Sequence, residues 1–347
     1  MELSKLQTKI LNAKSNKTIV ISSAASGKTH LLTEKVRQIL RAGVNPREIA
    51  VITFTNMAAA ELRQRLDTDY KDGLFIGTIH ALANYMLCSG GVNTSKILDD
   101  EKFDELFKLI KQHPKCVKKL EWVLLDEAQD SDPLQFTFLF DMIDPPCFFV
   151  TGDPKQSIYQ WKGSNPSLML KLSERAGAKV FDMNENYRNG SNILSYAKKI
   201  IRQTGLVDNS IAMAANPGEV TEIPFNIEDI IRFVQDGEEY GNWAILTRTN
   251  QEISDISYAL KKEKIPFDTF KQGDLSKEEL NIKMKQNTVK VLTVHSAKGL
   301  EWPNVIVIGM RYYNNEEKNI CYVAATRAKK KLVWMTARKK KAKVYEW

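Results

Sequence analysis

Short apolar runs alternate along this chain with stretches in which apolar residues recur at helical spacing. Such runs, rich in β-branched side chains, predict buried strands of parallel sheets, and the stretches between them predict helices. The expected strands are Thr18–Ser22, Ile49–Phe54, Trp122–Leu125, Phe148–Thr151, Trp243–Thr247, Val289–Val294 and Val305–Ile308. The runs form two groups. We therefore expect an α/β protein with two domains, residues 1–186 and 187–347, and a ligand crevice between them.

Composition agrees with a folded, two-domain protein. The 347 residues suffice for two domains of about 100 to 200 residues each, and 43% of them are hydrophobic. The formal net charge is +8, of which residues 316–347 contribute +7. Lys329–Lys331 lead into an expected last strand, and Arg338–Lys343 form a basic tail. Such an end indicates either a polyanionic partner or a solvated tail.

The chain shows no sign of a membrane span or of a structural metal. Its apolar runs are far shorter than the ~20 residues that a membrane helix needs, and the first residues lack a signal-peptide core. We therefore expect a cytoplasmic protein. The four cysteines are scattered, which favours reduced thiols over a zinc site or a disulfide framework.

A phosphate-binding loop is predicted directly after the first strand. Small residues lead into Gly27-Lys28-Thr29 and a predicted helix that extends to about Leu40. Small side chains let backbone N–H groups face phosphates, Lys28 would reach the β and γ oxygens of a nucleoside triphosphate, and Thr29 would bind Mg²⁺. The expected nucleotide-binding residues of this loop are Ser23, Ala24, Ala25, Ser26, Gly27, Lys28, Thr29 and His30.

An acidic pair follows the strand Trp122–Leu125. Asp126 would hold Mg²⁺ through water, and Glu127 would act as the general base for an attacking water. The plain alternative is a solvated acidic turn at the end of a strand. The phosphate loop about 100 residues upstream favours the catalytic interpretation.

Longer motifs in a fixed order resemble those of superfamily 1 helicases of the UvrD, Rep and PcrA type. The sequence Asp153-Pro-Lys-Gln-Ser157 also resembles the corresponding motif of the RecB and AddA branch of this family. The resemblance implies two RecA-like P-loop NTPase domains with ATP in the crevice between them, and ATP and Mg²⁺ as cofactors. The matching segments are Leu3–Gln7, Thr53–Arg65, Gly77–His80, Val150–Gly163, Asn186–Arg188, Ala244–Asn250, Thr293–Glu301 and Tyr322–Ala328.

The resemblance also implies roles around the nucleotide. Gln7 would read adenine, and Tyr187 would stack on it. Gln156 would sense the γ-phosphate, and Glu301 would contact the ribose or the water network. Arg188 and Arg327 would clamp the transferring phosphoryl group from the second domain. His30 replaces an arginine that is frequent in the family, so the adenine pocket is less well defined than the phosphate site.

A nucleic-acid track is expected from the same motifs. Aromatic rings at such positions stack on bases at about 1–3 kcal/mol each, without reading sequence. A structural role in the core is the alternative for Trp161, as it is for a lone histidine. The DNA-binding candidates are Phe54, Asn56, Thr78, His80, Tyr159, Trp161, Lys162 and His295.

The resemblance favours an ATP-driven motor over three other interpretations. The motor would move 3′ to 5′ on single-stranded DNA, unwind tailed duplex and act as a monomer. The alternatives are a nucleotide-switched clamp, a motor subunit with a separate nuclease partner, and a P-loop NTPase with another substrate. Intact catalytic residues argue against the clamp, and the aromatic track argues against the last.

Two features depart from the family pattern. Relatives usually carry an extra domain in each core domain, but here a small helical insertion, with a helix over Asp99–Gln112, is expected at about 82–120 and a very short one at about 268–288. We therefore expect a reduced motor that needs a partner to separate duplex. Ala25 replaces a common glycine; if φ is positive there, strain of about 1 kcal/mol would weaken ATP binding.

Overall fold

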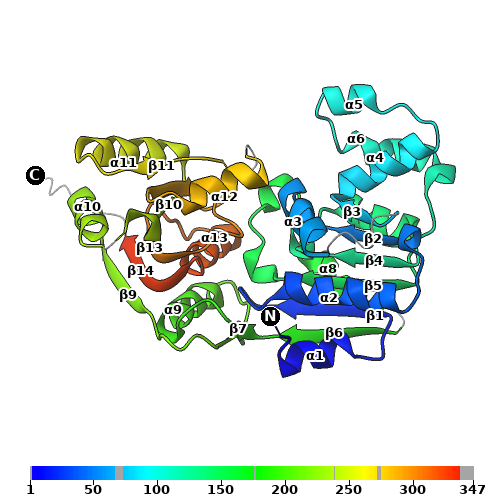
Figure 1. Ribbon diagram of the computed structural model, residues 1–347, viewed down its shortest axis with the longest axis horizontal. Coiled ribbons are helices and arrows are strands. Elements are labelled where there is room, and N and C mark those ends of the chain that lie inside the picture. Colours follow the sequence, from blue (N-terminus) through cyan, green and yellow to red (C-terminus); the bar gives the residue numbers. More distant parts are fainter. Residues whose placement is uncertain (1, 67–72, 176, 238, 272–274, 337–347) are drawn as a thin grey trace, which may run out of the picture. The chain divides into compact units, whose positions relative to one another are not determined.

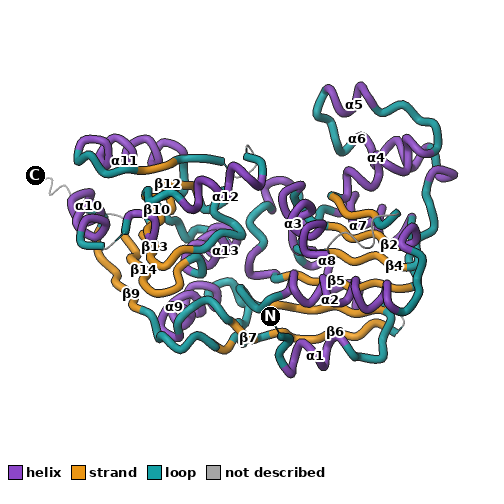
Figure 2. Tube along the Cα trace, in the orientation of Figure 1, coloured by secondary structure: helices purple, strands orange, loops and turns teal. Residues whose placement is uncertain are grey.

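The computed structural model describes residues 2–66, 73–175, 177–237, 239–271 and 275–336 (Figure 1). The basic tail Arg338–Lys343 lies outside the described residues. The chain divides into two compact units, with the boundary between Asn184 and Glu185. Each unit alternates strands with helices, as the tube in Figure 2 shows.

The described part of the first unit is built on a six-stranded parallel sheet with the order β3-β2-β4-β5-β1-β6. Its central strands β2, β4 and β5 are buried at every position, as expected of strands that are covered on both faces. The strands are β1 (Lys17–Ser22), β2 (Ile49–Ile52), β3 (Phe75–Gly77), β4 (Trp122–Leu125), β5 (Cys147–Gly152) and β6 (Ala178–Met183). Adjacent β1, β5 and β4 bring their carboxyl ends to one edge of the sheet.

Helices cover both faces of this sheet. One core cluster joins α1, α2 and α3 to side chains such as Val20 and Leu124, and the other joins α4 and α6 to Val123 and Phe148. The α2 helix buries one apolar stripe, including Leu32, Val36 and Ile39. The helices are α1 (Lys5–Leu11), α2 (Lys28–Arg41), α3 (Asn56–Leu66), α4 (Ile79–Ser89), α5 (Ser95–Asp99), α6 (Glu105–Gln112), α7 (Pro133–Thr137) and α8 (Ser167–Lys171).

The insertion differs from the prediction. Of the helical stretch expected over Asp99–Gln112, residues Glu105–Gln112 form α6, whereas Asp99 is the last residue of α5. Glu101 has φ 55, a left-handed conformation that ends the first helix before the second begins. Figure 1 shows α4, α5 and α6 gathered beyond the β3 edge of the sheet.

The second unit contains, within its described residues, another six-stranded parallel sheet, with the order β11-β12-β10-β13-β14-β9. Strands β7 and β8 pair over two residues each and form a separate small parallel sheet. The strands are β7 (Glu185–Asn186), β8 (Ile211–Ala212), β9 (Glu219–Pro224), β10 (Trp243–Thr247), β11 (Phe267–Asp268), β12 (Val289–Thr293), β13 (Trp302–Val307) and β14 (Ala328–Thr336).

Helices again pack on the sheet of the second unit. Apolar residues of α10 and α11 form one core cluster with the central strands, and α9 packs on α13 and on β14. The helices are α9 (Ser191–Arg202), α10 (Ile227–Gln235), α11 (Asn250–Lys262), α12 (Lys277–Lys285) and α13 (Asn315–Ala325). In the described residues, no helix is both long and apolar enough for a membrane span.

The structure confirms the α/β class, the parallel sheets and all seven strands expected from the sequence. It also confirms the strand expected after Lys329–Lys331, which is β14. Edge strands such as β6 and β9 escaped prediction, because exposed and half-buried positions interrupt their apolar pattern.

Candidate nucleotide and nucleic-acid sites

The phosphate loop lies at the carboxyl end of β1, where small residues turn the chain into α2. Gly27 precedes the helix with φ 80, a conformation that favours glycine. A Cβ atom there would lie 2.8 Å from the Gln7 amide nitrogen. Lys28, Thr29 and His30 form the first turn of α2, which offers backbone N–H groups and a positive dipole end to an anion.

The side chain of Gln7 braces this loop. Its Nε2 donates to the carbonyl oxygen of Ser26 at 2.9 Å, and its Oε1 accepts from the backbone N–H of Ser4 at 3.0 Å. Gln7 is only 1% exposed. Both ends of the amide therefore contact backbone, and adenine reading by Gln7 stays a prediction.

Ala25 does occupy the left-handed region, with φ 54. Neighbouring contacts hold the loop around it, because Ser26 Oγ donates to the carbonyl oxygen of Ser23 at 2.8 Å and Ala24 is fully buried. A non-glycine residue in this region stores about 1 kcal/mol of strain or more.

The first turn of α2 faces the acidic end of β4. Lys28 Nζ lies 3.0 Å from Glu127 Oε1, and Thr29 Oγ1 donates to Asp126 Oδ2 at 2.8 Å. Thr151, near the end of β5, donates to Asp126 Oδ1 at 2.6 Å. The parallel order of β1, β5 and β4 thus unites two motifs that are 97 positions apart.

Burial and charge act together at this edge. Burial alone would lower the pKa of Lys28, but the carboxylates of Glu127, Asp126 and Asp153 outweigh it and raise that pKa. Burial and the charge of Glu127 raise the pKa of Asp126, against the opposite effect of Lys28. Glu127 has φ 55, so strain is stored at the candidate general base.

The donor set at this edge fits magnesium. Thr29 Oγ1 and the Asp126 carboxylate are neighbouring hard oxygen donors, and Mg²⁺ is usually held by one or two carboxylates together with waters and substrate phosphates. Within the described ranges, no group of three or more His, Cys, Asp or Glu side chains forms a cage for a metal. A magnesium ion held by Thr29 and Asp126 would complete its coordination with water and phosphate oxygens.

The loop after β5 carries Gln156, the predicted γ-phosphate sensor. Its Nε2 donates to Asp153 Oδ2 at 2.7 Å, and the fully buried Asp153 also pairs with Lys155 at 3.0 Å. Gln129, for which the sequence predicts no role, is buried; it accepts from the Asp153 N–H at 2.9 Å and donates to Glu127. Only the neighbouring positions of β4 and β5 reveal this link.

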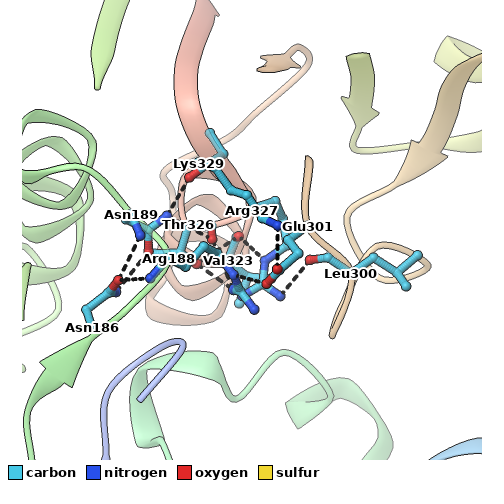
Figure 3. Close-up of polar contacts among 10 residues, drawn as sticks. Asn186, Arg188, Asn189, Leu300, Glu301, Val323, Thr326, Arg327 and Lys329 are labelled. Atoms are coloured by element: carbon cyan, nitrogen blue, oxygen red, sulfur yellow. Dashed lines mark hydrogen bonds and ion pairs between the residues drawn. The ribbon is translucent and has the colours of Figure 1, made fainter. Parts of the chain in front are cut away.

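The two predicted arginines lie in one cluster of the second unit (Figure 3). Arg188 Nε donates to Glu301, and its Nη1 donates to the carbonyl oxygen of Thr326 at 3.2 Å. Lys329 also pairs with Glu301, at 2.7 Å. Burial alone would raise the pKa of Glu301, but Arg188 and Lys329 outweigh it and lower that pKa.

Arg327 follows α13 and is only 1% exposed. Its guanidinium donates to the carbonyl oxygens of Val323 and Leu300, at 3.0 and 3.2 Å, and to the hydroxyl of Thr326 at 3.2 Å. These oxygens fix the orientation of the Arg327 guanidinium.

Two asparagines shape the segment that carries Arg188 (Figure 3). Asn186 Oδ1 accepts from the backbone N–H groups of Arg188 and Asn189, at 3.0 and 2.8 Å. Asn189 Nδ2 donates to the carbonyl oxygen of Thr326 at 3.1 Å. Tyr187, between them in sequence, is 41% exposed, and its hydroxyl donates to Glu185.

A cavity of about 630 Å³ in the first unit gathers Phe54, Thr78, His80 and Lys162, four of the predicted DNA contacts. Thr78 Oγ1 also caps α4 by accepting from the Ala81 N–H. His80 Nε2 lies 3.4 Å from an oxygen of Asp104, an insertion residue in the same lining.

Aromatic and basic side chains lie close together beside Phe54. The rings of Phe54 and Tyr159 stack with centroids 5.0 Å apart, and Lys162 Nζ lies 5.0 Å from the ring centroid of Trp161. Trp161 is 65% exposed, so the alternative of a core tryptophan is wrong. Asn56 is exposed at the start of α3, whereas His295 is half-buried in the second unit.

Family models match both units. The UvrD/REP helicase N-terminal domain matches residues 3–115 and 102–177, and the UvrD-like helicase C-terminal domain matches residues 181–280 and 269–339. Together these matches extend over most of the chain and agree with the two parallel sheets.

Individual relatives are distant. The chain is 24% identical to the ATP-dependent DNA helicase Rep of Escherichia coli (strain K12), over 72% of this chain and 52% of Rep. It is 24% identical to the ATP-dependent DNA helicase PcrA of Staphylococcus epidermidis, over 72% of this chain and 48% of PcrA. The chain is 23% identical to a probable DNA helicase of Mycoplasma pneumoniae, over 90% of this chain and 79% of that protein.

The chain thus spans about half the length of Rep and PcrA. The family assignment does not depend on these identities, because the two domain matches cover residues 3–177 and 181–339. The chain belongs to the UvrD-like helicases of superfamily 1.

Proposed function

We propose that this protein hydrolyses ATP to move along single-stranded DNA, 3′ to 5′, and to unwind tailed duplex. One observation carries the proposal. In the first unit, the short loop 152–165 lies against the acidic turn after β4 and carries the exposed aromatic track. Glu127 of that turn lies 3.0 Å from Lys28 of the phosphate loop, and Trp161 of the track is 65% exposed.

The chemistry of hydrolysis follows from the charges at the edge of the first sheet. The α2 N-terminus and Lys28 bind the phosphates, and Glu127 accepts the proton of the attacking water. Gln156 senses the γ-phosphate from the loop after β5. Bound Mg²⁺, held by Thr29 and Asp126, would neutralise phosphate charge and orient the leaving group.

The second unit supplies positive charge for the transition state. We place Arg188 and Arg327 on the transferring phosphoryl group, with Tyr187 against the adenine and Glu301 near the ribose. Arginines in such roles contribute about 10³- to 10⁵-fold in rate. Movement of the two domains, which we propose to be residues 1–186 and 187–347, would couple hydrolysis to translocation.

Single-stranded DNA is the proposed track of the motor. Trp161 and Tyr159 stack on bases, and Lys162 meets a phosphate, while Phe54, Asn56, Thr78 and His80 extend the contact surface on the first unit and His295 on the second. The monomer is the proposed working state.

A partner-dependent clamp or translocase is the second candidate. The insertion between α4 and β4 is small, with helices of only five and eight residues. We therefore propose that a partner protein, such as a nuclease, assists duplex separation.

One pair of assays tests the motor proposal. ATP hydrolysis is measured with and without single-stranded DNA, and unwinding is measured on 3′-tailed and 5′-tailed duplexes. We expect stimulation by DNA and preference for the 3′ tail. Equal hydrolysis rates with and without DNA would refute the motor, and stimulation without unwinding would favour the clamp or translocase.

Trp161→Ala tests the aromatic track. The side chain is largely exposed, so the fold should survive, while loss of one stacking contact of about 1–3 kcal/mol should lower DNA affinity at least fivefold. Tyr258→Ala is the matched control, because Tyr258 is 75% exposed on α11 of the second unit. Equal DNA binding by the two variants would contradict the assignment of the track.

A further inference from the structure

We infer that Gln129 is a positioning residue that couples the DNA-contact loop to the candidate general base Glu127. The inference rests on the proposed function and deepens it. Gln129 lies in the 3₁₀ turn Ala128–Asp130, directly after the acidic end of β4, and its side chain is fully buried.

Gln129 spans the space between two motifs. Its Nε2 donates to the Glu127 carboxylate, and its Oε1 accepts from the backbone N–H of Asp153 at 2.9 Å. Gly152 makes this approach feasible, because a Cβ atom there would lie 2.8 Å from Gln129 Oε1. Asp153 in turn accepts from Gln156 at 2.7 Å. The general base and the γ-phosphate sensor are therefore connected through one amide.

The chemistry of the two partners requires an amide at this position. A backbone N–H can only donate, and an ionised carboxylate can only accept. The orientation of the Gln129 amide is fixed by these partners, since the reversed amide would oppose donor to donor and acceptor to acceptor. A glutamate would place a second carboxylate against Glu127, and a leucine would leave both partners without this contact.

The same loop is fastened to the acidic turn at further points. Ser157 Oγ donates to the carbonyl oxygen of Gln129 at 3.3 Å, and Ser164 Oγ donates to that of Asp130 at 2.6 Å. The backbone N–H of Asn165 donates to the carbonyl oxygen of Ser131 at 3.0 Å. Hydrogen bonds thus connect residues 153–165 to the acidic turn at several positions along both segments.

The DNA contacts lie within this fastened loop. Tyr159, Trp161 and Lys162 fall between the contacts of Ser157 and Ser164. Burial, together with the charges of Asp130 and Glu127, raises the pKa of Tyr159 above its usual range, which places its hydroxyl in the field of the acidic turn. A base that stacks on Trp161 and Tyr159 fixes the loop, and Gln129 then fixes the carboxylate of Glu127 for water activation.

Gln129→Leu tests this coupling in the full chain. We expect ssDNA stimulation of ATP turnover, the ratio of the rates with and without DNA, to fall at least tenfold, while the KM for ATP and the ssDNA affinity change by less than about threefold. These quantities are measured by steady-state hydrolysis and by fluorescence anisotropy of a labelled oligonucleotide. A merely structural role would lower all of them together.

Two further variants keep the test decisive. Gln38→Leu, on the half-buried face of α2, is the matched control and should retain full stimulation. If Gln129→Leu does not fold, Gln129→Asn takes its place. Asparagine keeps the amide but is one methylene too short to reach both partners, so this variant should also lose stimulation. Full stimulation in a folded Gln129 variant overturns the inference alone, whereas absent stimulation in the unmodified protein overturns the proposed function as well.

Discussion

The two units hold their candidate catalytic groups in different ways. In the first unit, charged side chains hold one another: Lys28 pairs with Glu127, and Lys155 with Asp153. In the second unit, backbone carbonyl oxygens and a hydroxyl help to hold Arg327, and Arg188 and Lys329 pair with the carboxylate of Glu301. The second site thus adds backbone acceptors to the ion pairs on which the first site depends.

This difference assigns distinct tasks to the two units. Lysines and carboxylates that hold one another would position the phosphates and the metal ion of a bound nucleotide. An arginine that several hydrogen bonds hold in one orientation is preorganised for a phosphoryl group that gains charge in the transition state. Variants of the first site should therefore affect binding and turnover, and variants of the second should affect mainly turnover.

Lys28→Ala should have the largest effect. It removes the cation that would reach the β and γ oxygens and leaves Glu127 without its partner at 3.0 Å. We expect ATP turnover to fall by at least about 10³-fold, and nucleotide affinity to weaken as well. Steady-state hydrolysis and binding of a fluorescent nucleotide measure these two effects.

Lys9→Ala provides the control for this variant. Lys9 is exposed near the end of α1 in the same unit, so the substitution removes one lysine charge from the surface. Its turnover should equal that of the unmodified protein. A Lys28→Ala protein that keeps more than a tenth of the activity would contradict the assignment of the phosphate loop.

Much of the first site could be predicted from sequence, because its two motifs are contiguous and each combines a strand with its chemistry. The sequence predicts Lys28, Thr29, Asp126 and Glu127 as one site, and in the structure Lys28 lies within hydrogen-bonding distance of Glu127 and Thr29 of Asp126. Thr29 and Asp126 are 97 positions apart in the sequence, and the parallel strands bring them together at one edge of the sheet. The alternation of strands and helices along the chain already predicts such a parallel sheet.

The supporting contacts could not be predicted in the same way. Gln129 and Asp153 are linked because β4 lies beside β5, and nothing in their spacing indicates that register. Arg248 and Glu317 form another missed pair, at 2.6 Å, between the end of β10 and the first turn of α13. Such contacts join separate elements, so they become visible only when side chains are placed.

The arginines of the second unit test the contrast directly. Arg327→Ala should lower kcat by about 10²- to 10³-fold, because it removes a buried guanidinium that three hydrogen bonds hold in one orientation. Arg188→Ala should lower it less, by about tenfold, since Glu301 already offsets part of its charge. The KM for ATP should change little in both. Single-turnover hydrolysis with saturating ATP compares them.

A thermal unfolding curve separates catalysis from folding in these variants. Arg327 is buried, and its loss leaves the carbonyl oxygens of Val323 and Leu300 without that donor. Arg327→Lys retains the positive charge but not the planar guanidinium with its several N–H donors. Its kcat should therefore lie between those of Arg327→Ala and the unmodified protein. A larger loss in Arg188→Ala than in Arg327→Ala would reverse the ranking of the two arginines.

The smallest predicted effect concerns the strain at Ala25. Strain at φ 54 weakens ATP binding only if the loop adopts this conformation with the nucleotide and relaxes without it. The surrounding contacts argue otherwise, because Gln7 and Ser23 hold Ser26 through bonds that belong to the protein itself. We therefore expect the strain to reduce the stability of the fold and to leave nucleotide affinity unchanged.

Ala25→Gly distinguishes the two cases. Glycine relieves about 1 kcal/mol of left-handed strain but loses about 0.4–1 kcal/mol through the greater freedom of the unfolded chain. The free energy of unfolding should thus rise by a few tenths of a kcal/mol at most, measured by urea denaturation. ATP affinity should stay within twofold. A tighter ATP complex with unchanged stability would instead show that phosphate binding imposes the strain, and would make the loop of the first unit less preformed than its contacts indicate.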